Sequence, residues 1–174
     1  SKNSSLVSLV LTENKLQNSA SPEAYSIDMS KGAIVVASSS EAGLFNGVTS
    51  FLQLIRLAEN KAGTVMLDCW QIKDAPGYGW RGLMLDESRH FFGLEKLKSL
   101  IDWMAFYKLN RFHWHLTDEP GWRMEVKKYP KLTTVGGIGN FSDSTAPARY
   151  YNQAQIKELV AYAAERHIMV IPEI

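Results

Sequence analysis

The sequence predicts an α/β protein in two parts, and three observations lead to that prediction. Up to about residue 75, several short strand patterns surround a single helical pattern. From about residue 80, short apolar runs alternate with helical patterns in the order strand, helix, strand, helix, strand. Between the two parts, the turn-forming residues Asp74-Ala75-Pro76-Gly77 indicate a domain boundary.

Residues 1–75 are expected to form a small, sandwich-like α+β accessory domain. Four segments have the apolar or alternating pattern of strands, namely 6–11, 25–29, 33–37 and 65–72. A polar loop follows the first of them and contains Asn14, Gln17 and Asn18. A helix is expected over residues 41–58, with preceding serines as N-cap candidates. Its apolar face is expected to consist of Leu44, Val48, Phe51, Leu52 and Ile55.

The second part comprises residues 76–174. Three short apolar runs predict strands at 82–85, 111–116 and 168–171. The first connecting helix is expected to bury Leu94, Leu97, Ile101, Met104 and Ala105. A long loop, 117–150, precedes the second helix, which opens with a capping-box pattern at Asn152 and Gln155. This helix is expected to bury Ile156, Leu159, Val160 and Ala163.

Strands that alternate with helices imply a parallel sheet with right-handed crossovers. Such a sheet needs cover on both faces, and a complete (β/α)8 TIM barrel takes about 250 residues. Residues 76–174 supply only three strands. The simplest expectation is the first part of a TIM barrel, truncated after its third strand, although a second chain could complete it instead.

Composition excludes several classes of partner. The formal net charge of the 174 residues is +1 and no basic run stands out, so no bulk field attracts nucleic acid. No apolar run approaches the roughly 18 residues of a membrane span. The single cysteine, Cys69, excludes an internal disulfide and leaves the compartment open.

Ionisable residues follow each predicted barrel strand at the end where TIM barrels carry their catalytic groups. The first strand runs into Asp86, and the third ends at Glu173. The second contains His113 and His115 and runs into Asp118. Three such placements together favour an active site at this edge of the sheet more than any one of them does, and Glu173 by itself supports no conclusion.

Each placement also has a structural interpretation. Asp86 and Arg89 could form an ion pair that closes a loop, and Asp118 could cap a turn. His113 and His115 share one face of their strand, so they could be hydrogen-bonded core histidines. Alternatively, the two imidazoles and Asp118 could hold a divalent ion, as in a metal-dependent barrel hydrolase.

Three motifs in the second part carry a family resemblance. They are WRGLMLDESRHFF at 80–92, NRFHWHLTD at 110–118 with GWR at 121–123, and AYAAERHIMVIPEI at 161–174. In this order and spacing they resemble glycoside hydrolase family 20, the β-N-acetylhexosaminidases. Residues 1–75 resemble the small domain that precedes the barrel in that family.

The resemblance implies roles for three residues. Arg89 matches an arginine that binds hydroxyls of the terminal sugar, a task suited to the two parallel donors of a guanidinium. Asp118 matches an aspartate that supports a histidine in contact with the general acid, and His115 is expected to provide further support. Neither Asp86-Glu87 nor Asp118-Glu119 matches the family's adjacent Asp-Glu pair, because both lie on the wrong strands. No catalytic residue is therefore assigned in this chain, and the pair is expected downstream.

The resemblance also implies an activity: hydrolysis of terminal N-acetylglucosamine or N-acetylgalactosamine from glycans or chitooligosaccharides. The family's retaining mechanism is substrate-assisted, and it implies no metal or organic cofactor. A periplasmic, extracellular or lysosomal-type compartment is suggested by the family alone. Without the Asp-Glu pair this chain is expected to be inactive by itself, and a non-catalytic carbohydrate-binding fragment is the remaining alternative.

Overall fold

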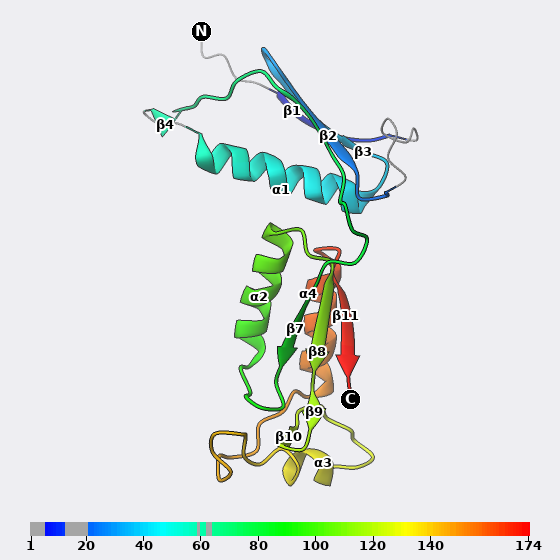
Figure 1. Ribbon diagram of the computed structural model, residues 1–174, viewed down its shortest axis with the longest axis vertical. Coiled ribbons are helices and arrows are strands. Elements are labelled where there is room, and N and C mark those ends of the chain that lie inside the picture. Colours follow the sequence, from blue (N-terminus) through cyan, green and yellow to red (C-terminus); the bar gives the residue numbers. More distant parts are fainter. Residues whose placement is uncertain (1–5, 13–20, 59, 62–63) are drawn as a thin grey trace. The chain divides into compact units, whose positions relative to one another are not determined.

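The computed structural model describes residues 6–12, 21–58, 60–61 and 64–174 (Figure 1). The chain folds into two compact units, Ser1–Gly79 and Trp80–Ile174. The polar loop expected around Asn14, Gln17 and Asn18 lies outside the described residues. Within the described ranges, no helix has both the length and the apolar character that crossing a membrane requires.

The first unit contains a four-stranded mixed sheet with the strand order β1-β3-β2-β6. Its strands are β1 (Leu6–Leu11), β2 (Tyr25–Ser30), β3 (Ala33–Ser38) and β6 (Gln71–Asp74). β3 runs parallel to β1 and antiparallel to β2, which in turn runs antiparallel to β6. The first three strands predicted from the sequence are therefore confirmed.

The prediction of one strand over residues 65–72 is wrong. β5 (Thr64–Val65) pairs with β4 (Asn60–Lys61), whereas β6 pairs with β2, and residues 66–70 between them form no strand. The apolar run indicated burial, but a run of this kind does not reveal which strand will supply its hydrogen-bonding partners.

Helix α1 (Glu41–Leu57) packs on this sheet. The Ser40 hydroxyl caps it by accepting a hydrogen bond from the Gly43 amide at 3.1 Å, as the serine run predicted. Phe51 joins a buried core contributed by the strands, namely Tyr25, Ile27, Met29, Ile34 and Val36. Three further predicted face residues pack partly buried against that core, namely Leu44, Val48 and Ile55.

Leu52, which was expected on the buried face, is 49% exposed. The buried residues of α1 include Gly43 and Gly47, and a Cβ at Gly43 would lie only 2.1 Å from the Ser38 hydroxyl oxygen. The helix therefore contacts the sheet along its glycines. At 100° per residue, Leu52 falls on the opposite side of the helix from Gly43 and Gly47, which a count of large apolar residues alone did not show.

Substitution of Gly43 by alanine is expected to destabilise the first unit by about 2 kcal/mol, because the steric cost of overpacking outweighs the higher helix propensity of alanine. The added methyl group would also lie 2.5 Å from the Ala24 carbonyl oxygen, which cannot move without displacing the strand. Urea denaturation measures the change. Gly77→Ala is the control, since its added Cβ meets no atom within 4 Å, and equal stability of the two variants would contradict the close contact.

The second unit contains a three-stranded sheet with the order β11-β8-β7 (Figure 1). Its strands, all parallel, are β7 (Gly82–Asp86), β8 (Arg111–His115) and β11 (Met169–Glu173). The helices α2 (Leu94–Phe106) and α4 (Gln153–Ala164) form the two crossovers and pack on each other. The predicted alternation of strands and helices is thus confirmed.

The predicted helix faces are confirmed in most positions. Leu97, Ile101, Met104 and Ala105 of α2 are buried, as are Leu159 and Ala163 of α4. The capping box is present, because Asn152 Oδ1 accepts from the Gln155 amide and Gln155 Oε1 accepts from the Asn152 amide. Leu94, the first residue of α2, is only half-buried. Ile156 is also half-buried and Val160 is exposed, because α4 buries a narrow stripe centred on Leu159 and Ala163.

The segment 117–150, expected to be a loop, contains short regular elements. β9 (Thr117–Asp118) and β10 (Gly121–Trp122) form a small hairpin, and α3 (Lys131–Thr134) is a single helical turn. Elements of two to four residues are too short to show a periodic pattern. The hairpin matters for the site because it holds Asp118 beside the strand ends.

Candidate active site

The register of the parallel sheet aligns three ionisable residues at its C-terminal edge. Asp86 pairs with His115, and His115 pairs with Glu173, across β7, β8 and β11. Two backbone hydrogen bonds extend the pairing past the strand ends, from the Glu87 amide to the His115 carbonyl at 2.9 Å and from the Leu116 amide to the Glu173 carbonyl at 3.0 Å. These side chains therefore start from a rigid edge rather than from free loops.

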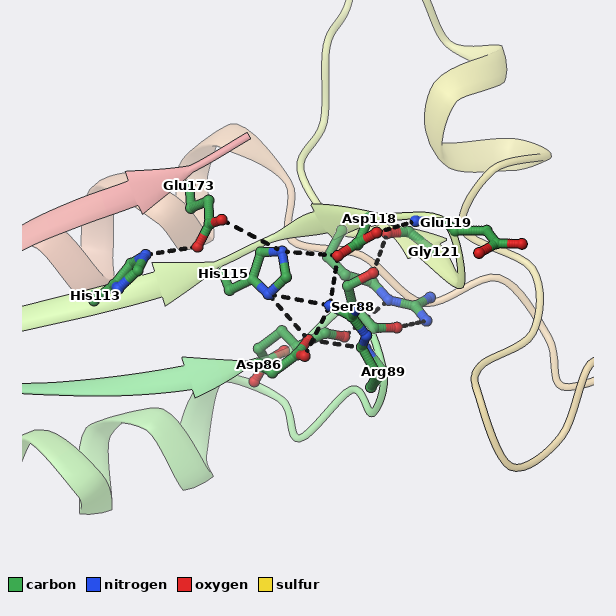
Figure 2. Close-up of polar contacts among 11 residues, drawn as sticks. Asp86, Ser88, Arg89, His113, His115, Asp118, Glu119, Gly121 and Glu173 are labelled. Carbon is green, nitrogen blue, oxygen red and sulfur yellow. Dashed lines mark hydrogen bonds and ion pairs between the residues drawn. The ribbon is translucent and has the colours of Figure 1, made fainter.

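Arg89 lies between two carboxylates of this edge (Figure 2). Its Nη1 is 3.1 Å from Asp86 Oδ2 and 2.5 Å from Asp118 Oδ2, and its backbone amide donates to Asp86 Oδ1 at 3.0 Å. The ion pair between Asp86 and Arg89 considered from the sequence is present, and it includes Asp118 as well. The Arg89 side chain remains 45% exposed, so it is restrained on one side and open on the other.

His115 occupies the centre of the cluster and is nearly buried. Its Nδ1 lies 3.4 Å from Asp86 Oδ1, and its Nε2 lies 3.5 Å from Asp118 Oδ2 and 3.9 Å from Glu173 Oε1. His113 contacts the other oxygen of the Glu173 carboxylate, with its Nε2 2.6 Å from Glu173 Oε2. Both histidines are therefore held by carboxylates (Figure 2). In the described part of the chain, no three His, Cys, Asp or Glu residues are placed to hold a metal ion.

The electrostatic surroundings keep Asp118 ionised. The hydrogen bond from the Glu119 amide, at 2.7 Å, holds the pKa of the Asp118 carboxyl below its ordinary value. The positive charge of Arg89 and the neighbouring His115 act in the same direction. Asp118 is therefore a permanent acceptor near neutral pH, which suits a residue that orients a cationic or hydrogen-bond-donating partner.

A pocket of about 420 Å³ adjoins this cluster. Its lining combines polar groups with apolar surface, and consists of Arg89, Glu119, Pro120, Ile138, Gly139, Asn140, Phe141 and Ser144. The Phe141 amide donates to the Arg89 carbonyl at 3.1 Å, so the pocket wall is fixed to the backbone that carries the arginine. The Phe141 ring is 81% exposed. Aromatic surface beside hydrogen-bonding groups is the mixture that a sugar ring requires.

A buried layer beneath the site was not anticipated from the sequence. Glu87 is fully buried, and its Oε2 accepts from the Tyr151 hydroxyl at 2.8 Å. The Tyr151 hydroxyl in turn accepts from the Gly93 amide, at 2.9 Å, just before α2. Burial raises the pKa of the Glu87 carboxyl to about 7. No strand pattern indicated this burial, because Glu87 lies in the turn that follows β7.

Comparison with known proteins decides the family. The family model described as "Glycosyl hydrolase family 20, catalytic domain" matches residues 78–174. The model described as "Glycosyl hydrolase family 20, domain 2" matches residues 2–75. The chain belongs to glycosyl hydrolase family 20. This family 20 chain is 42% identical to a β-hexosaminidase of Porphyromonas gingivalis over 156 residues, which are 87% of the chain and 20% of that protein.

Two solved structures agree with this assignment. The Streptomyces plicatus N-acetyl-β-hexosaminidase, in complex with Thio-NAglucal, has a TM-score of 0.86 at 37% identity, covering 97% of this chain and 33% of that one. The exo-β-N-acetylglucosaminidase of Vibrio harveyi, in complex with N-acetylglucosamine, has a TM-score of 0.85 at 33% identity, covering 97% and 27%. The predicted fold class, a small α/β domain followed by the beginning of a barrel, is confirmed. The family 20 chain spans a fifth to a third of these relatives' lengths.

Proposed function

We propose that this chain is part of a β-N-acetylhexosaminidase that removes terminal non-reducing N-acetylglucosamine or N-acetylgalactosamine from glycans or chitooligosaccharides. The observation that carries the proposal is the cluster of Arg89, Asp118 and His115 at the strand ends of a family 20 chain, beside an open pocket with mixed lining. The relatives named β-hexosaminidase and N-acetyl-β-hexosaminidase support the substrate class.

In this proposal Arg89 binds the hydroxyls of the terminal sugar. Asp86 and Asp118 hold Nη1, and the Arg89 side chain is 45% exposed, so its five-donor guanidinium remains open to a sugar. Because Asp86 ends strand β7 and Asp118 is held in the β9–β10 hairpin, the arginine is preorganised and loses little side-chain entropy when a sugar binds. Pyranose hydroxyls on adjacent carbons match the parallel donors of a guanidinium.

Asp118 and His115 support the acid that protonates the leaving group. Asp118 is ionised and accepts hydrogen bonds, so it can orient an imidazole supplied from beyond the third strand. His115 lies between Asp86 and Asp118 and fixes their separation. The reaction itself would use an adjacent Asp-Glu pair, in which the aspartate orients the sugar's acetamido group and the glutamate protonates the glycosidic oxygen. The acetamido oxygen attacks the anomeric carbon, and water then opens the resulting ring with retention.

The 174-residue chain alone is expected to be inactive, because it contains neither member of that pair in a matching position. Purified chain incubated with a chromogenic β-N-acetylglucosaminide should release no more product than a buffer blank. Sequencing the source DNA past Ile174 should show an open frame with an adjacent Asp-Glu pair, and the protein it encodes should hydrolyse the same substrate. Hydrolysis by the 174-residue chain, or a longer protein without activity, would contradict the proposal.

A further inference from the structure

Arg123 is a buried charged residue that connects two segments of the site. Its side chain is almost fully enclosed, and its guanidinium donates to five backbone carbonyls. Two of them follow β7, with Nε 3.1 Å from the Glu87 oxygen and Nη2 3.0 Å from the Ser88 oxygen. The other three lie in the segment after β10, at distances of 2.8 to 3.2 Å, and belong to Gly137, Gly139 and Arg149.

These two segments carry the groups that the proposed function requires. Ser88 directly precedes Arg89, and Gly139 belongs to the wall of the adjoining pocket. The Phe141 amide joins the same two segments a second time by donating to the Arg89 carbonyl. A single guanidinium therefore fixes the backbone of the sugar-binding arginine relative to the pocket wall.

The surroundings of Arg123 are shaped to hold a guanidinium. A Cβ at Gly121 would lie 2.4 Å from Arg123 Nη2, so the absence of a side chain at Gly121 leaves the space that the guanidinium occupies. The Ser88 hydroxyl donates to the Gly121 carbonyl at 2.9 Å, so a side-chain hydrogen bond also joins the residues around the guanidinium to one another. The nearby Glu87 carboxyl supplies an opposite charge when it is ionised. A planar group with five donors can satisfy this set of carbonyls, and a lysine cannot.

We propose that Arg123 is a positioning residue for carbohydrate binding, acting through Arg89 and the pocket wall without touching the substrate. This inference rests on the proposed hexosaminidase function. If Arg89 holds the terminal sugar equally in the ground state and in the transition state, a displaced Arg89 weakens both equally. Loss of such uniform binding raises KM and leaves kcat unchanged.

The test is Arg123→Lys in the full-length protein, assayed with a chromogenic β-N-acetylglucosaminide. KM is expected to rise roughly tenfold, with kcat within about threefold of the unsubstituted protein. Equilibrium binding of N-acetylglucosamine, measured by calorimetry, should weaken by a similar factor. Lysine keeps the positive charge, so the substitution tests the planar arrangement of donors in the guanidinium and not the charge.

Arg166→Lys is the matched control. The Arg166 side chain is also mostly enclosed, donates from Nε to Asp102 at 2.8 Å and covers the Tyr162 ring, but it joins α2 to α4 and reaches neither site segment. Arg166→Lys should lower the thermal midpoint of unfolding without changing KM. Ser88→Ala is a milder variant. It removes the hydrogen bond from the Ser88 hydroxyl to the Gly121 carbonyl and should raise KM about twofold to threefold.

Each outcome decides the proposal. A rise in KM for Arg123→Lys and Ser88→Ala but not for Arg166→Lys supports it. Loss of stability with unchanged KM, or a fall in kcat alone, overturns it and leaves Arg123 with a purely structural role. If Arg123→Lys does not fold, unchanged KM in Ser88→Ala overturns it. An unsubstituted protein without hexosaminidase activity would instead refute the proposed function.

Discussion

Replacement of Arg89 by alanine is expected to lower kcat/KM of the full-length protein for terminal N-acetylglucosaminides by about 10³-fold, because two charge-assisted hydrogen bonds to the sugar are lost. The substitution also leaves Asp86 and Asp118 without the cation between them, since Nη1 of Arg89 is within 3.1 Å of both carboxylates. Steady-state kinetics with a chromogenic substrate measures the loss, which should lie mainly in KM.

Two further variants make this prediction specific. Arg89→Lys keeps the charge but lacks the planar guanidinium with its parallel donors. Its kcat/KM should therefore lie between those of Arg89→Ala and the unsubstituted protein. Arg111→Ala removes an arginine from the opposite, N-terminal end of the sheet, where its guanidinium lies 5.4 Å from the centre of the Trp80 ring, and it should leave kcat/KM within about twofold. Equal losses in Arg89→Ala and Arg111→Ala would indicate a general effect on folding and would remove Arg89 from the sugar-binding site.

The second unit could be predicted from the sequence because its elements follow simple periods. The buried face of α2 and the capping box of α4 were predicted correctly, since the residues that form each lie close together in the sequence. The first unit was less accessible. Leu52 was misplaced because the contact of α1 depends on Gly43 and Gly47, which carry no hydrophobic signal. The residues between Val65 and Gln71 were misassigned because strand pairing depends on partners distant in sequence.

The candidate site likewise contains one group of residues that the sequence predicted and one contact that it did not. Asp86, His115 and Glu173 could be grouped in advance, because parallel strands bring their C-terminal ends to one edge. The contact between Arg89 and Asp118 could not be predicted from spacing alone, because it depends on the short hairpin after β8.

The buried residues beneath the site were missed for a related reason. Charged residues are almost never fully buried unless they are paired, and the partners are far apart in sequence. Tyr151 meets Glu87 across 64 positions, and Arg123 reaches the Glu87 carbonyl across 36. No local pattern indicates such pairs, so they became visible only in the folded structure.

Glu87 should make stability depend on pH. Its folded-state pKa of about 7 lies above the ordinary value of 4.5, chiefly because burial disfavours the charged form, while the hydrogen bond from Tyr151 opposes the shift. The folded state therefore binds the proton more tightly than the unfolded state. The resulting stabilisation is complete below about pH 4.5, declines as pH rises through 7, and amounts to about 3 kcal/mol.

Glu87→Gln should abolish this dependence, because an amide does not titrate in that range. The free energy of unfolding, measured by denaturant titration of the full-length protein between pH 5 and pH 8, should fall with pH less steeply in the variant than in the unsubstituted protein. Any constant offset from the new amide is the same at each pH and does not enter the comparison. Glu165→Gln serves as the control, since this carboxylate is 76% exposed and should leave the pH profile unchanged. Parallel profiles for Glu87→Gln and the unsubstituted protein would show that Glu87 is already ionised throughout this range and that Arg123 fully compensates its burial.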